Sequence, residues 1–173
     1  MKKTLSSILA AVFSLSSMQL ATAQTVANAP PAPVPAARGP ALELAIEAAR
    51  VAIDTCAGLE QKIGVSIVDS AGVPKVVLAS DGVLPRGVQS STSKALTALA
   101  FKTATSQLGE QIKTDKELAD KVAANSSYNS RAGGVLLKSN NEVIGAIGVG
   151  GARGSEKDEA CALAGIQKIQ SRL

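Results

Sequence analysis

The 173-residue sequence has no histidine and no tryptophan, and it has only one tyrosine and two phenylalanines. Without histidine, the chain has no Ser-His-Asp triad, no imidazole general base and no histidine-bound metal site. No serine lies in the Gly-x-Ser-x-Gly pattern of a nucleophile elbow. The sequence therefore predicts neither a metal site nor a set of catalytic residues.

The N-terminus has the pattern of a secretory signal peptide. Lys2 and Lys3 give a positive start, an apolar stretch runs from Leu5 to Leu20, and Ala21-Thr22-Ala23 supplies a small-x-small cleavage pattern. We expect residues 1–23 to be removed on export, so that the mature protein is periplasmic or secreted. No second apolar stretch is long enough to span a bilayer.

Residues 24–40 are rich in proline and alanine, a composition that favours an extended, solvated backbone. Both a flexible linker and a remnant of processing fit this segment. The remaining residues, 41–173, have the size of one domain. Without Lys2 and Lys3 the chain has 16 basic and 14 acidic residues, and this weak net charge of +2 does not indicate nucleic acid as a partner.

The chain has two cysteines, Cys56 and Cys161. In an exported protein a disulfide is the default expectation. It would close a loop of roughly 100 residues, worth about 4 to 5 kcal/mol in the chain-entropy model. Two buried thiols and a redox site are the alternatives, although the chain has no Cys-x-x-Cys spacing.

The apolar pattern predicts two hairpins and several helices. Strands are expected at 62–68 and 73–79, and again at 135–138 and 142–149 around a turn at Asn140-Asn141. Helices are expected from Pro40 to about Gly58, over 91–105 and over a polar stretch to 124 that is broken near Gly109 and Thr114. A last helix at 156–171 follows Ser155 and Asp158, which resemble a capping box. Hairpins of this kind indicate an α+β fold with an antiparallel sheet covered by helices.

The glycine-rich stretch GAIGVGGARG, residues 145–154, does not match a nucleotide-binding motif. Gly154 is followed by Ser155 and Glu156 instead of a lysine, and Arg153 occupies the third glycine position of a dinucleotide fingerprint. Arg153 and the start of the last helix could hold an anion, but acidic residues already fill that first turn. We interpret four glycines as structural, because they let another backbone lie directly on the strand: Gly145, Gly148, Gly150 and Gly151.

One helical face combines Lys94, Thr97, Phe101 and Thr105 at spacings of three and four. In one interpretation Phe101 packs into the core and Lys94 reaches outward to solvent. In the other, this face is the wall of a pocket for an acidic organic ligand, such as a haem propionate or a small carboxylate. Tyr128 lies in a polar loop and fits a surface or interface tyrosine. Tyr128 and reduced cysteines are also the only usual haem ligands in the mature chain.

Four stretches together carry a family resemblance: VSIVDSAGVPKVVLASDG (65–82), SSTSKALTALAFKTAT (90–105), Gly133-Gly134 and EVIGAIGVGGARGSEKDEACALAGI (142–166). With them the chain, from about Leu42 to Ile169, resembles the GlcG/HbpS-like haem-binding family, which is related to the C-terminal domain of PduO-type proteins. The last stretch is the most specific of the four.

The resemblance implies a profilin-like three-layer sandwich with an antiparallel five-stranded sheet, assembled into homo-oligomers. In such a fold the first and last helices lie side by side, which suits a bond between Cys56 and Cys161. The resemblance also implies an exported haem or tetrapyrrole binder, with haem as a possible cofactor, in haem handling or redox sensing. A binder or sensor of a small organic acid without haem is the alternative, and a haem-degrading or corrinoid-related enzyme is a third.

Two positions depart from the family pattern. Arg86 stands where many exported relatives have histidine, and Val135 stands where a proline usually follows the Gly-Gly pair. Arg86 can pair with a ligand carboxylate, whereas no residue is assigned as an iron ligand. The candidate ligand-binding residues are Arg86, Lys94, Thr97, Phe101, Thr105 and Tyr128.

Overall fold

The computed structural model describes residues 36–173, which form one compact unit. The predicted signal peptide and residues 24–35 of the Pro/Ala-rich segment lie outside the described residues. The elements follow one another as α1 (Leu42–Ala57), β1 (Gly64–Asp69), β2 (Pro74–Ala79), α2 (Pro85–Phe101), α3 (Thr105–Gln111), α4 (Lys116–Ala123), β3 (Gly134–Ser139), β4 (Glu142–Gly150), α5 (Ser155–Ile169) and a short 3-10 turn, Gln170–Arg172.

The sheet is fully antiparallel, with the strand order β2-β1-β4-β3. The expectation of five strands is wrong for the described residues, which contain four. The chain between β2 and β3 is mainly helical, from Pro85 to Ala123, and residues 124–133 form turns and a loop instead of a strand. The turn between β3 and β4 is formed by Asn140 and Asn141, both with positive φ, as their tolerance of that conformation predicts.

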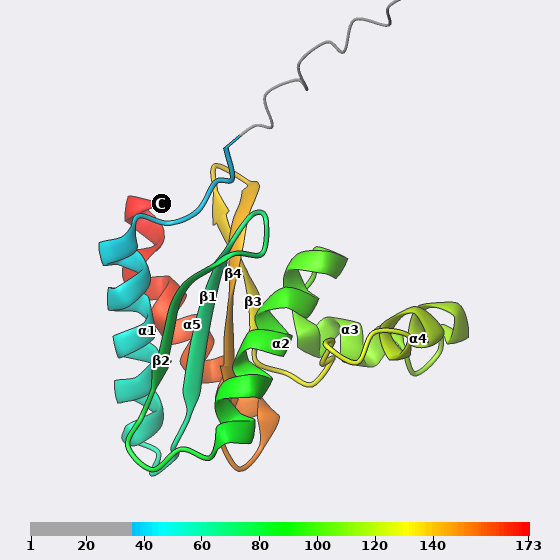
Figure 1. Ribbon diagram of the computed structural model, residues 1–173, viewed down its shortest axis with the longest axis horizontal. Helices are drawn as coiled ribbons and strands as arrows, with labels where there is room; N and C mark the ends of the chain where they lie inside the picture. The colour runs from blue at the N-terminus through cyan, green and yellow to red at the C-terminus, as the bar shows by residue number, and fades with distance from the viewer. Residues whose placement is uncertain (1–35) are drawn as a thin grey trace, which may run out of the picture. The chain divides into compact units, whose positions relative to one another are not determined.

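Helices cover both faces of the sheet and make three layers (Figure 1). On one face α1 and α5 pack side by side, and on the other α2 crosses β1, β4 and β3. All six residues of β1 are buried because the strand is central and covered on both sides. Four small residues of α1, Ala45, Ala48, Ala49 and Ala52, are completely buried and allow close packing against α5.

The backbone of α2 lies directly on the sheet. A Cβ atom on Gly148 would fall 1.9 Å from the carbonyl oxygen of Ser91, and a Cβ atom on Gly134 would fall 2.3 Å from that of Lys94. No side chain fits at either distance. The glycines of β3 and β4 therefore set how closely α2 approaches the sheet, and with it the positions of the side chains at the start of α2.

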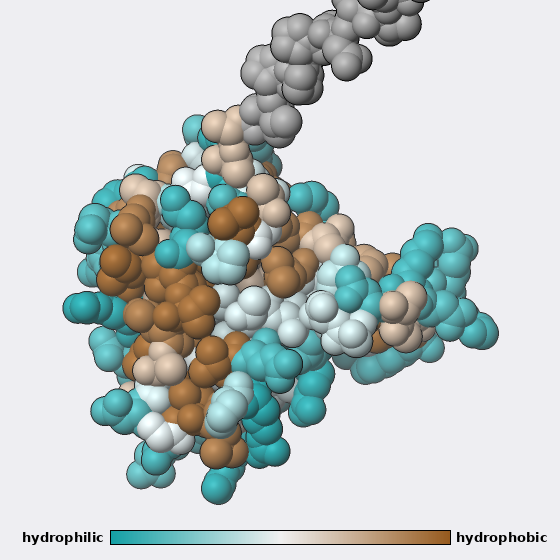
Figure 2. Space-filling model, in the orientation of Figure 1, coloured by the Kyte–Doolittle hydropathy of each residue, from teal (hydrophilic) through white to brown (hydrophobic). Residues whose placement is uncertain are grey.

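Helices α3 and α4 form an arm that extends away from the sheet (Figure 1). The polar stretch is broken between Gln111 and Lys116, close to the predicted break, and Asp115 caps α4 by accepting a hydrogen bond from the Leu118 N–H. Figure 2 shows a hydrophilic arm and apolar side chains gathered over α1 and β2. In residues 36–173 no helix is both long and apolar enough to cross a membrane.

Candidate ligand-binding site

Two adjoining cavities of about 470 and 510 Å³ lie where β4 ends and α2 and α5 begin. Both are lined by Arg86, Gly87, Gly151 and Arg153, and we call the two together the cationic cleft. Its charged lining residues are the cations Lys62, Arg86, Lys94, Arg131 and Arg153 and the carboxylates Glu60 and Asp158. The balance of charge favours an anionic ligand.

Glycine shapes one wall of this cleft. Gly151 and Gly154 have φ values of 121° and 104°, which side chains rarely allow, and they turn the chain between β4 and α5. The first turn of α2 approaches the same loop, since a Cβ atom on Gly87 would fall 3.1 Å from the Gly150 carbonyl oxygen. The end of the stretch GAIGVGGARG thus lines the cleft, with Arg153 between the two turning glycines.

Lys94 and Asp158 form a buried ion pair in the lining of the cleft. The Lys94 Nζ donates hydrogen bonds to Asp158 Oδ2 at 2.7 Å and to the Val149 carbonyl oxygen at 3.0 Å. Asp158 Oδ1 accepts a hydrogen bond from the Ala152 N–H at 3.0 Å. The pair therefore connects α2 and α5 to the loop that carries Arg153.

This ion pair corrects two expectations from the sequence. Lys94 does not reach outward to solvent, because its side chain is only 3% exposed. Asp158 does not cap α5, whose N-cap is Gly154 without a side-chain hydrogen bond. Asp158 lies on the buried face of α5, three residues before Cys161, and the buried ammonium group of Lys94 is a stronger partner than exposed backbone N–H groups.

Burial disfavours the charged forms of both partners. Desolvation lowers the pKa of Lys94, and the hydrogen bond and charge of Asp158 oppose that change. Desolvation also raises the pKa of Asp158, against the hydrogen bond and charge of Lys94. Arg131 lowers both pKa values by its positive charge, and Glu159 acts on Lys94 in the opposite direction.

Three arginines of the cleft are exposed: Arg86, Arg131 and Arg153. None of them forms an ion pair with a carboxylate among the described residues. Arg131 donates from Nε to the Ser155 hydroxyl at 3.2 Å, and the Arg153 N–H donates to Gln61 Oε1 at 2.7 Å. Their guanidinium groups are thus available to a ligand with carboxylate or other anionic oxygens.

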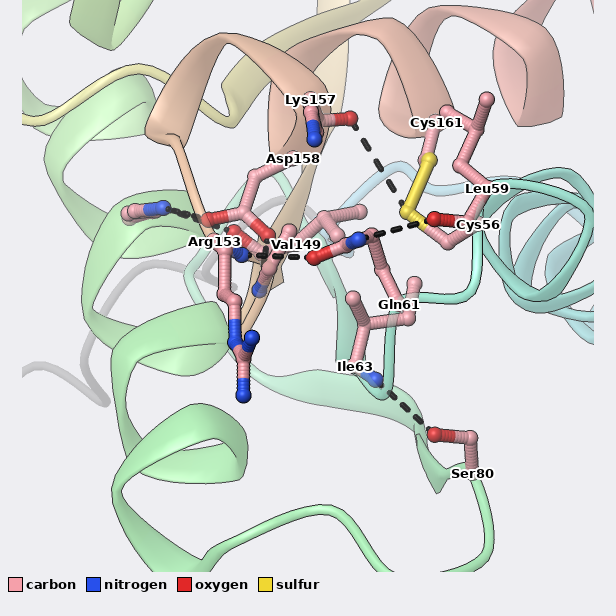
Figure 3. The surroundings of a disulfide bond; sticks show 12 residues. Cys56, Leu59, Gln61, Ile63, Ser80, Val149, Arg153, Lys157, Asp158 and Cys161 are labelled. Atoms are coloured by element: carbon pink, nitrogen blue, oxygen red, sulfur yellow. Dashed lines mark hydrogen bonds and ion pairs between the residues drawn. A yellow bond between two sulfur atoms is a disulfide. The ribbon is translucent and has the colours of Figure 1, made fainter.

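The disulfide lies close to the loop between β4 and α5 that lines the cleft. Cys56 at the end of α1 and Cys161 in α5 are bonded, with their Cα atoms 5.7 Å apart. Figure 3 shows Gln61 between the disulfide and Arg153. The Gln61 N–H donates to the Cys56 carbonyl oxygen at 2.9 Å, and the Gln61 side chain accepts the Arg153 N–H. The fixed end of α1 therefore supports the loop that lines the cleft.

The two threonine candidates form hydrogen bonds with backbone groups and do not line the cleft. Thr97 is completely buried; its hydroxyl donates to the Ser93 carbonyl oxygen and accepts the Asn129 N–H. The Thr105 hydroxyl accepts the Gly134 N–H at 2.8 Å. Both therefore fix the segment between α4 and β3, which brings Arg131 to the cleft.

The two aromatic candidates lie together elsewhere. Phe101 and Tyr128 pack edge to face with ring centroids 5.3 Å apart. Tyr128 lines a separate hollow of about 440 Å³ beside Gly72, Leu96 and Leu99, near the turn between β1 and β2. Of the six candidate residues, the structure brings only Arg86 and Lys94 together in the cleft.

Neither Arg131 nor the role of Asp158 is predicted from the sequence. A buried-face position could have identified Asp158, because it falls one helical turn before Cys161. Arg131 lies in a segment without periodic pattern, so no signal in a single sequence marks it.

Known proteins share the sequence pattern and the fold of this chain. The model of a family described as haem-degrading, HbpS-like proteins matches residues 41–167. The chain belongs to the HbpS-like family. Its profilin-like sandwich is confirmed, apart from the number of strands. No curated protein matches the sequence significantly.

Three solved structures illustrate the likeness. A crystal structure of HbpS is 30% identical, with a TM-score of 0.70 over 76% of this chain and 90% of that one. A double mutant of HbpS from Streptomyces reticuli is 28% identical, with a TM-score of 0.72 over 83% and 98%. A complex of PduOC with haem is 25% identical, with a TM-score of 0.69 over 75% and 94%.

Proposed function

We propose that this protein is an exported binding protein that takes up haem, or a similar tetrapyrrole, by its carboxylate groups in the cationic cleft. The observation that carries the proposal is the convergence of Arg86, Arg131 and Arg153, none paired with a carboxylate of residues 36–173, on one cavity. Membership of the HbpS-like family and the likeness to a PduOC–haem complex support haem as the ligand. The pattern of residues 1–23 and the disulfide support export.

The cleft is better suited to bind the carboxylate groups at the edge of a tetrapyrrole than to coordinate its metal. Each part has the size of an ordinary ligand pocket, and Leu84, 57% exposed, offers an apolar side chain beside the arginines. Arginine binds carboxylates through two parallel hydrogen bonds. The lining contains no cysteine, methionine, histidine or tyrosine, which are the usual axial ligands of haem iron. The residues therefore fit propionate groups and do not fit an axial iron bond, and we assign no chemical step to haem.

The missing iron ligand favours a second candidate, a small organic acid bound without haem. The same arginines would hold its carboxylate, and the polar lining would contact the rest of the molecule. We also propose that the protein forms homo-oligomers, as the family resemblance implies. Two exposed valines support this proposal: Val77 in the edge strand β2, and Val73 directly before that strand. Light scattering tests it.

Titration of the purified protein with hemin separates the candidates. A saturable shift of the absorption band is expected, and metal-free protoporphyrin is expected to bind similarly because the carboxylates carry the interaction. Arg86→Gln and Arg131→Gln should each weaken binding about 10- to 100-fold, as for the loss of a charged hydrogen bond. Arg50→Gln, at an exposed arginine of α1, should not.

Calorimetry with succinate and pyruvate is the second arm of the test. Binding of these acids without any shift by hemin would replace the first candidate by the second. Binding of neither class would overturn both. If Arg50→Gln weakened hemin binding as much as Arg86→Gln, the attraction would be general charge and not the cleft.

A further inference from the structure

Lys94 differs from every other lysine in residues 36–173, because it alone is buried. It nevertheless lines the cleft, with Asp158 beside it. Carboxylate binding by the arginines does not use this amine.

The surroundings of Lys94 are those of an activated amine. An amine reacts as a nucleophile only after it loses its proton, and Asp158 Oδ2 lies 2.7 Å from Nζ to receive one. Burial lowers the pKa of Lys94 and raises the pKa of Asp158, so both changes favour this proton transfer. The positive charge of Arg131 acts on the pKa of Lys94 in the same direction as burial, whereas the hydrogen bond and charge of Asp158 and the charge of Glu159 oppose it.

The same cavity can orient a reactant. Arg86, Arg131 and Arg153 line it together with Lys94, so a carboxylate held by an arginine places the adjoining atoms of a small molecule within the same 510 Å³. The group that reacts reversibly with a lysine amine is an aldehyde or ketone carbonyl. A 2-oxo acid carries that carbonyl directly beside its carboxylate.

We propose that Lys94 forms an imine with the carbonyl group of a small 2-oxo acid bound in the cationic cleft. The ammonium proton passes to Asp158, and the Nζ lone pair attacks the carbonyl carbon to form a C–N bond. The carbonyl oxygen takes two protons from Nζ, both relayed by Asp158, and the C–O bond breaks to release water as the C=N bond forms. One amine and one carbonyl give one imine and one water, without a redox change. This inference rests on the carboxylate binding proposed for the cleft.

The test traps the imine. Purified protein is incubated with pyruvate and cyanoborohydride, which reduces an imine to a stable secondary amine, and the modified lysine is located by peptide mass spectrometry. Modification of Lys94 should be at least about tenfold faster than that of any exposed lysine, because the reactant is oriented. Acetone, which has the same carbonyl without a carboxylate, should not show this selectivity, and neither should protein unfolded in urea.

Variants assign the roles. Asp158→Asn should slow the trapping at Lys94 although it lowers the pKa of Lys94 further, because no carboxylate then carries protons to the leaving oxygen. Arg86→Gln should raise the pyruvate concentration needed for half-maximal trapping. Mapping of the modified lysines on the protein without substitutions shows whether Lys94 forms the imine, even where a variant fails to fold. Modification spread over exposed lysines, or equal selectivity with acetone, overturns the proposal. If pyruvate binds in calorimetry but is not trapped at Lys94, only the imine is overturned. If pyruvate neither binds nor is trapped, the site for a small organic acid is overturned as well. The hemin titration tests haem binding separately.

Discussion

The Nζ of Lys94 lies 2.7 Å from Oδ2 of Asp158, across 64 residues of sequence, with both side chains at most 4% exposed. The pair also holds the Val149 carbonyl oxygen and the Ala152 N–H. Since these four groups belong to α2, α5 and the chain at the end of β4, a single ion pair fixes three parts of the cleft. Taking one partner away leaves a buried charge uncompensated, which costs more than the pair contributes.

Removal of either partner should therefore be strongly destabilising. Lys94→Met and Asp158→Asn are each expected to lower the free energy of unfolding by about 3 to 5 kcal/mol, measured by urea denaturation. The double variant should lose clearly less than the two single losses together, because neither charge is then left alone. The exposed pair Lys116 and Asp120 is the control, and its variants should change stability little. Additive losses at positions 94 and 158 would contradict the coupling.

The pH dependence of Asp158→Asn follows from the sign of the Lys94 shift. Asp158 opposes the lowering of the Lys94 pKa, so its removal moves that pKa further below the ordinary value of 10.5. Between the lowered pKa and 10.5 the unfolded chain binds more protons than the folded chain, so stability rises with pH across this window. Unfolding free energies at neutral and alkaline pH should rise more steeply in the variant than in the unmodified protein. Parallel pH profiles would show that Lys94 does not carry an isolated charge.

The disulfide between Cys56 and Cys161 joins positions 105 residues apart. Replacing both cysteines by alanine is expected to cost about 4 to 5 kcal/mol of stability, mainly because the unfolded chain gains freedom. Reductant should destabilise the unmodified protein by a similar amount and leave the variant unchanged. Equal stability of the protein with and without reductant would mean that the bond is absent or without effect.

Local patterns in the sequence were sufficient to predict most of the helices and strands. The two hairpins lie within a few residues of the predicted strands, since alternation, turn residues and Asn140-Asn141 act on neighbouring residues only. Helix α2 begins six residues earlier than predicted, at Pro85, because Asp81-Gly82 and the following Pro-Arg-Gly resemble a loop. Proline at a first helical position is favourable, so the same residue that suggested a loop begins the helix.

The site was less predictable, because it depends on contacts between distant segments. A polar residue such as Lys94 or Asp158 is expected at the surface when each helix is considered alone, and only the packing of α2 and α5 across β4 buries both. Thr97 shows the same limit: its hydroxyl holds Asn129, 32 residues away, where helical spacing suggested a ligand. The spacing correctly placed Lys94 and Thr97 on the buried face of one helix, but α2 ends at Phe101 and Thr105 begins α3. It could not show what these residues contact.

The glycines of β4 give a sharper test of the helix–sheet packing. Gly148→Ala should lower the free energy of unfolding by about 1 to 3 kcal/mol. The added Cβ would lie 1.9 Å from the Ser91 carbonyl oxygen and must push α2 away from the sheet. Gly58→Ala is the matched control: its Cβ meets only an ordinary contact at 3.4 Å and its φ is −61°, so stability should be unchanged or slightly higher. Equal melting temperatures for the two variants would contradict this packing.

Tyr128→Phe tests where a tetrapyrrole binds. The Tyr128 ring packs against Phe101 and lines a hollow that shares no lining residue with the cationic cleft. Removal of its hydroxyl should therefore leave both the position of the hemin absorption band and the dissociation constant unchanged, whereas Arg86→Gln should weaken binding. The variant retains the aromatic contact with Phe101, so a loss of fold is not expected. If Tyr128→Phe shifted the band and Arg86→Gln had no effect, iron would be held at the tyrosine, and the hollow near the β1–β2 turn would replace the cleft as the haem site.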